Sequence, residues 1–167
     1  MNINFLAVLV AALVPMVMGF IWYNPKVLGN AWMQAAGLNE EKMKGANMAV
    51  IFIVSFILSF LLAFFTQSLV IHQFHIGAAF FDYRDHIEDP STPEGALFKQ
   101  VMDLVGSGHR TFGHGAFHGV LSGLFLVTPI IATGAMFERK SFKYIAINCG
   151  YWIICLAIMG GIVCGWV

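Results

Sequence analysis

Residues 48–71, MAVIFIVSFILSFLLAFFTQSLVI, decide the fold because they carry no charged side chain over their whole length. A helix needs about 20 consecutive apolar residues to cross the hydrocarbon core of a bilayer, and this stretch is long enough to do so. It therefore predicts a membrane-spanning helix whose solvent is lipid.

Three further stretches, residues 3–22, 112–137 and 144–167, have the same character. The chain is 59% hydrophobic and 11% charged, with a mean hydropathy of +0.77. A soluble domain is roughly 45–50% apolar and roughly 25% charged. The predicted fold class is therefore an all-α membrane protein, in which four transmembrane helices form an up-down bundle and a single domain over residues 1–167.

The basic residues predict the orientation of the bundle. The first and third connections are rich in lysine and arginine, whereas the long second connection, residues 72–111, is mainly acidic. The positive-inside rule places the basic connections in the cytoplasm, so both termini and the long loop are expected to face outward. The basic residues are Lys26, Lys42 and Lys44 in the first connection and Arg139, Lys140 and Lys143 in the third.

Two connections contain patterns that are typical of short helices. In residues 24–37, Asn24 can cap a helix, Pro25 suits its first position and the final glycine can end it. Residues 92–106 repeat this order of cap, proline and terminal glycine, and place apolar side chains on one face. We expect both segments to form amphipathic helices at the membrane surface.

Each predicted span carries small residues at a spacing of four, which places them on one stripe of its helix. In lipid, such stripes let backbones approach closely, either within the bundle or against another copy of the chain. Because four helices bury few faces, we expect a homo-oligomer. The predicted packing residues are Ala11, Gly19, Ser59, Gly115, Gly119, Gly123, Gly161 and Gly165.

All six histidines lie between residues 72 and 118. His72 and His75 follow the second span, and His114 and His118 begin the third. Consecutive antiparallel helices usually pack as neighbours, so the four imidazoles are expected at the same outer edge of the bundle. His114 and His118 are separated by about 6 Å along the helix axis.

This cluster predicts a site for a transition metal ion (Zn, Fe or Cu), since imidazole is a ligand for each of them. An alternative is a proton relay, and interfacial histidines can also cap helix ends or bind backbone carbonyls without any ligand. No HExxH motif indicates a zinc hydrolase, and no catalytic or cofactor-binding motif was identified. The predicted metal ligands are His72, His75, His114 and His118, completed by Asp82, Asp85 and His86.

The segments GFIWYNPKVLGNAWMQAAGLNEEKMKGANMA (19–49) and INCGYWIICLAIMGGIVCGW (147–166) resemble a bacterial family of small four-helix membrane proteins catalogued only as a domain of unknown function. The resemblance implies four spans and a bacterial membrane location, but no activity. Taken with the orientation predicted from the basic residues, this location is the inner membrane, with both termini in the periplasm. The long connection with its histidines departs from the usual pattern of the family. The similar positions include Gly19, Trp22, Tyr23, Pro25, Gly29, Trp32, Asn148, Gly150 and Tyr151.

The net charge of +0 argues against nucleic acid as a partner. The expected partners are the lipid bilayer and further copies of the chain, with another membrane protein as an alternative partner. The favoured function is a non-enzymatic, homo-oligomeric scaffold or accessory component with an outward histidine and acid patch. The alternatives are a small transporter or channel that binds a metal ion or proton at that patch, and a metal-dependent membrane oxidoreductase.

Overall fold

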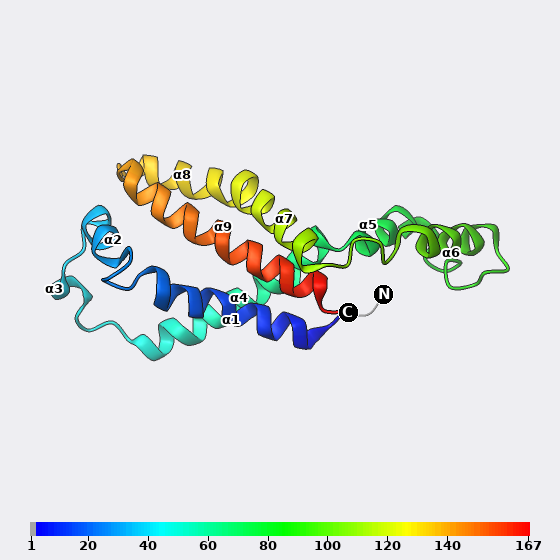
Figure 1. Ribbon diagram of the computed structural model, residues 1–167, viewed down its shortest axis with the longest axis horizontal. Coiled ribbons are helices and arrows are strands. Elements are labelled where there is room, and N and C mark those ends of the chain that lie inside the picture. Colours follow the sequence, from blue (N-terminus) through cyan, green and yellow to red (C-terminus); the bar gives the residue numbers. More distant parts are fainter. Residues whose placement is uncertain (1–2) are drawn as a thin grey trace.

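The computed structural model describes residues 3–167, and its elements are helices (Figure 1). Four helical segments are long and apolar enough to cross a membrane, judged by length and composition. They are α1 (Phe5–Trp22), α4 (Met48–Val70), the segment Phe112–Phe137 and α9 (Phe142–Gly165). The third segment consists of α7 (Phe112–Ser122), the π-helical turn η2 (Gly123–Val127) and α8 (Thr128–Phe137). The predicted all-α, four-span fold class is confirmed.

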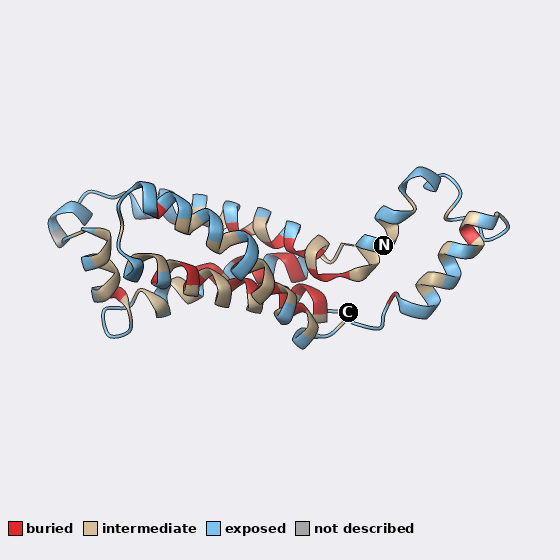
Figure 2. Ribbon diagram, turned by 90° about the horizontal axis from the view of Figure 1, so that it is seen from above, coloured by how far each residue is buried: buried red, intermediate tan, exposed pale blue. Residues whose placement is uncertain are grey.

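Helix α9 is the centre of the bundle and contacts α1, α4, α7 and α8. Its side chains Cys155, Met159 and Cys164 are fully buried, together with Val8 of α1 and Ala63 of α4. The outward faces of α1 and α4 remain apolar and exposed, as Figure 2 shows for the sides of the bundle. Exposed apolar surface on this scale is expected where a helix faces lipid.

The glycines of α7 bring its backbone directly against α9. A Cβ atom at Gly115 would overlap the carbonyl oxygen of Gly160, and one at Gly119 would overlap that of Leu156. Gly123 lies against Ile153 in the same way. This row therefore packs inside the chain, and it fixes the distance between the third span and the core.

The other predicted packing residues also have neighbours within the chain. Ala11 and Ser59 are buried. Gly161 and Gly165 face Phe112 at the start of α7, while Gly19 lies near the Tyr151 hydroxyl. These stripes are thus used in intramolecular contacts, and a homo-oligomer stays a prediction that needs other support.

The start of α1 and the end of α9 lie at one end of the bundle (Figure 1). At the opposite end lie α2 (Gly29–Ala36) and α3 (Glu40–Met43). From the first end, α5 (His72–Ala79), the 3-10 turn η1 (Phe81–Tyr83) and α6 (Pro93–Val105) project beyond the bundle. We call these elements, residues 72–105, the arm.

The arm corrects one expectation from the sequence. Residues 72–111 were expected to form a loop with one helix, but the chain forms a second helix, α5, directly after α4. The rings of Phe80 and Phe98 pack edge to face at 5.3 Å and hold α5 to α6. The predicted helix and its two ends are confirmed for α6, since Thr92 caps it and Gly106 follows its last residue. Its location at the membrane surface stays a prediction.

The first connection forms its helix later than the sequence indicated. The Asn24 side chain accepts a hydrogen bond from the Lys26 backbone, which stabilises a turn rather than a helix start. Helix α2 therefore begins at Gly29, so the predicted start at residues 24–25 is wrong. Its end is as expected, because Gly37 adopts a left-handed conformation with φ of 74°.

Candidate metal centre

A break in the backbone after α4 positions the first histidine. Ile71 is buried and extended, with φ of −106° and ψ of 110°, so the helix stops and restarts as α5. His72 is the first residue of that new helix. The break turns its imidazole out of the α4 register and toward the start of α7.

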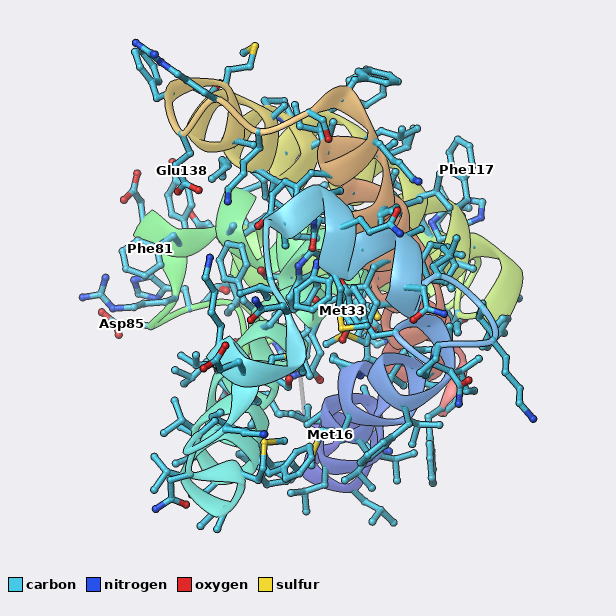
Figure 3. All side chains as sticks on the ribbon, turned by 90° about the vertical axis from the view of Figure 1, so that its left-hand side faces the viewer. Met16, Met33, Phe81, Asp85, Phe117 and Glu138 are labelled. Carbon is cyan, nitrogen blue, oxygen red and sulfur yellow. The ribbon has the colours of Figure 1, made fainter. Side chains whose placement is uncertain are left out.

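Helix α7 supplies two imidazoles one turn apart. The Thr111 side chain caps the helix by accepting a hydrogen bond from the His114 backbone at 3.2 Å. The rings of His114 and His118 then lie with their centroids 4.5 Å apart. Phe117, between them in the sequence, is exposed and points outward on another face of the helix (Figure 3).

The three imidazoles converge from two different helices. The Nε2 atoms of His72 and His114 are 3.0 Å apart, and the ring centroids of His72 and His118 are 5.6 Å apart. One nitrogen from each of the three rings lies within 4.8 Å of the other two, and each residue is half-buried. Such convergence is what chelation of a single ion by side-chain nitrogens requires.

The surroundings favour neutral imidazoles. Burial lowers the pKa of His72 below its ordinary value, and the neighbouring imidazoles of His114, His109 and His75 lower it further. A proton on one ring would repel a proton on the next. Metal ions bind the neutral form of histidine, so the same environment that disfavours protons leaves the nitrogens available to a metal.

The geometry fits a small divalent ion. With Zn–N bonds of about 2.0–2.1 Å, donors on a tetrahedral zinc ion are about 3.3–3.4 Å apart. The 3.0 Å pair is already near that spacing, and rotation of the His118 side chain would bring the third nitrogen in. Three imidazoles leave one coordination position for water, substrate or a further ligand.

The other predicted ligands lie elsewhere on the arm. His75 is one turn beyond His72, with ring centroids 6.1 Å apart. The Asp85 carboxylate is exposed 3.9 Å from Arg84, at the outer edge of the molecule in Figure 3. Asp82 lies in η1 and His86 in the turn before α6. Within residues 3–167, the converging group consists of His72, His114 and His118, and it includes none of these four residues.

Sequence reasoning missed His109 as a neighbour of the site. Its ring centroid lies 4.8 Å from that of His114 and 5.1 Å from that of His72. The signal was its position two residues before the Thr111 cap, which keeps it near the first turn of α7. The contact with His72 depends on tertiary packing and carried no signal in the sequence.

A second group of polar and aromatic side chains lies toward the opposite end of the bundle. The Tyr23 hydroxyl donates to Asn148 Oδ1 at 3.1 Å, and Trp22 Nε1 donates to the Ile147 carbonyl at 3.1 Å. The Tyr151 hydroxyl donates to the carbonyl of Pro15 at 2.6 Å. These bonds join α9 to α1 and its C-terminal flank. The four side chains that form them are among the positions behind the family resemblance, and they have a structural role there.

The sequence model of one protein family, described as protein of unknown function (DUF1761), matches residues 6–164. No curated protein and no solved structure matches the chain.

Proposed function

The chain belongs to the DUF1761 family, and on that premise we propose that it is a membrane protein that binds one transition metal ion at His72, His114 and His118. The observation that carries this proposal is the convergence of three imidazole nitrogens within 4.8 Å. His72 comes from α5, whereas His114 and His118 come from α7. Their convergence therefore depends on the tertiary fold and does not follow from local sequence.

Simpler uses of these histidines are less consistent with the contacts. Interfacial histidines without a ligand usually bind backbone carbonyls or cap helices. Within residues 3–167, the hydrogen bond that these three rings make is the one between His114 and His72. The cap of α7 is a threonine. The imidazoles are therefore grouped with one another, as ligands of one ion would be.

The ion-binding proposal also accounts for the molecule better than a purely oligomeric scaffold does. The small-residue stripes that suggested an oligomer pack against partners inside the chain, as for Gly115 and Gly119 against α9. Oligomerisation is compatible with ion binding, but no contact among the described residues 3–167 requires it. The three histidines, by contrast, direct ring nitrogens toward one another.

We place the site at the outer face of a bacterial inner membrane. The site lies at the end of the bundle where α1 starts and α9 ends, whereas Lys42, Lys44 and Lys140 lie around the other end. The positive-inside rule assigns the end with these lysines to the cytoplasm. An ion could then reach the imidazoles from the periplasm without crossing the bilayer.

Metal analysis of the purified full chain tests this function. The protein, in detergent and saturated with zinc before removal of free ion, is expected to retain about one zinc per chain. A double variant, His114→Ala with His118→Ala, should lose that zinc, and so should His72→Ala, which changes no contact inside the bundle core. His86→Ala on the arm is the matched control and should retain it.

Two results would refute the proposal. One is wild-type protein that holds no zinc under saturating conditions. The other is a double variant that holds as much zinc as wild type while its helix content and elution volume are unchanged. Variants that lose zinc must show the same helix content as wild type, so that loss of ligand is separated from loss of fold.

A further inference from the structure

The proposed ion has one coordination position that His72, His114 and His118 do not fill. The segment between α6 and α7 lies beside the rings of His72 and His114. His109 in this segment is exposed to water, but its ring is stacked on that of His114 at an interplanar angle of 21°, with centroids 4.8 Å apart. It also lies edge to face with His72 at 5.1 Å. His109 thus contacts both members of the closest pair in the site.

The His109 carbonyl and the Arg110 side chain hold this part of the segment against the bundle. The carbonyl of His109 accepts a hydrogen bond from the Cys164 thiol at 3.3 Å. The next residue, Arg110, donates to the carbonyls of Cys164 at 2.8 Å and Trp166 at 3.2 Å, and to Gln73 Oε1 at 3.0 Å. Arg110 therefore ties the end of α9 to α5 and holds His109 above the site.

Within residues 3–167, no hydrogen bond holds the ring of His109, whereas its backbone carbonyl accepts one from the Cys164 thiol. The residue is exposed, and Gly106 and Gly108 precede it in the bend that follows α6. Its ring nitrogens are not part of the group within 4.8 Å. A rotation of its side chain toward the other rings would bring in a fourth nitrogen, and the reverse rotation would reopen the position to water.

We infer that His109 is the fourth ligand of the ion and closes the site against the aqueous phase, with Arg110 as the residue that positions it. This inference rests on the proposed function. In this assignment, His72, His114 and His118 determine the affinity for the ion, and His109 determines the rate at which the ion is released. The ligand class is a divalent ion that accepts four imidazoles in tetrahedral geometry, such as Zn²⁺ or Co²⁺.

Ion release from the full chain provides the first test. Protein loaded with one zinc is mixed with excess chelator, and the rate of release is followed with a zinc indicator. His109→Ala should retain the stoichiometry of wild type and release zinc at least about tenfold faster. Loss of a residue that supports a metal site typically changes metal affinity by at least this factor. His75→Ala, which removes the other flanking imidazole, is the matched control and should release zinc at the wild-type rate.

A gain of signal provides the second test and does not depend on weakened binding. In Co²⁺-loaded His109→Cys, a thiolate ligand would add a near-ultraviolet sulfur-to-cobalt charge-transfer band that wild type lacks. His75→Cys should show no such band. For Arg110, the charge-removing variant Arg110→Gln in the His109→Cys background should weaken this band, whereas Arg110→Lys should retain part of it.

The outcomes separate the two proposals. Wild type that binds no zinc or cobalt refutes the proposed function and this inference with it. Wild type that binds one ion, with unchanged release in His109→Ala and no band in His109→Cys, refutes only the role of His109. Equal acceleration in His75→Ala and His109→Ala also refutes it, because any loss of a nearby imidazole would then suffice.

Discussion

The Nε2 atoms of His72 and His114 lie 3.0 Å apart, although 42 residues separate the two histidines in the sequence. This contact joins the start of the arm to the third span, since His72 is the first residue of α5 and His114 lies in the first turn of α7. It requires that the second span ends on the same side of the membrane as the third begins. The proposed ion site depends on that arrangement.

The topology makes the first prediction. Single cysteines at Ser91, on the arm, and at Lys44, at the other end, should react from opposite sides of a sealed membrane, because the bundle separates them. The native cysteines are buried and should give little background. In intact cells stripped of their outer membrane, an impermeant maleimide should label Ser91→Cys, and label Lys44→Cys only after lysis. Labelling of both from the same side would contradict the four-span topology.

The second prediction concerns the close approach of α7 and α9. Gly119→Ala places a methyl group into the Leu156 carbonyl, so the helices must separate. We expect a loss of about 1–3 kcal/mol in the free energy of unfolding, measured by denaturant titration in detergent. Gly134→Ala is the matched control, since nothing lies within 4 Å of a Cβ there. Equal stability of the two variants would show that this packing is wrong.

The third prediction concerns the pH dependence of stability in the metal-free protein, and it follows from the lowered pKa of His72. The folded chain keeps this imidazole neutral at pH values where the unfolded chain already binds a proton. Stability is therefore at its full value above the ordinary histidine pKa of about 6.5, and falls as the pH drops through that value toward the lowered pKa. In the presence of a chelator, the melting temperature at about pH 5.5, below that pKa, should be lower than the melting temperature at about pH 7.5, above it.

His72→Gln should reduce this pH-dependent loss of stability, because it removes one of the repelled groups. His86→Gln, a histidine outside the cluster, should leave the loss as it is in wild type. A melting temperature that rises as the pH falls would have the wrong sign for the structure, since it would mean that folding favours protonated histidines.

The fourth prediction concerns the hydrogen bond between Tyr151 and Pro15. Its loss should change the stability of the protein without changing ion binding. Tyr151→Phe removes the hydroxyl that donates to the Pro15 carbonyl at 2.6 Å, so we expect a loss of about 1 kcal/mol in the free energy of unfolding. The same variant should still hold wild-type zinc, because this bond is not part of the histidine cluster. Tyr83→Phe, on the exposed arm, is the control for stability, and zinc loss in Tyr151→Phe would mean that the two regions are coupled.

The sequence was sufficient for the spans because hydropathy alone defines them in lipid. It also placed His72 beside His114, since consecutive spans are neighbours and both residues adjoin span ends. It could not exclude Asp82 and Asp85 from the site, because that depends on α5 forming after the break at Ile71 and carrying them along the arm. A loop in their place could have folded back over the imidazoles.

The position of His109 was also beyond the sequence. It depends on Arg110, whose partners Gln73, Cys164 and Trp166 lie 37, 54 and 56 residues away. No periodicity or local motif signals such a bond. The start of α2 was missed for a local reason, because Asn24 and Pro25 suit a turn as well as they suit a helix start, and the turn is what forms.

The coordination sphere of the bound ion tests the central claim most directly. X-ray absorption at the zinc edge of the one-zinc protein should show a first shell of at least three imidazole nitrogens at about 2.0–2.1 Å. His72→Ala treated in the same way should retain no zinc at the site and should therefore lack this shell. A first shell of oxygens alone would contradict the account, and so would a cysteine sulfur at about 2.3 Å from the zinc.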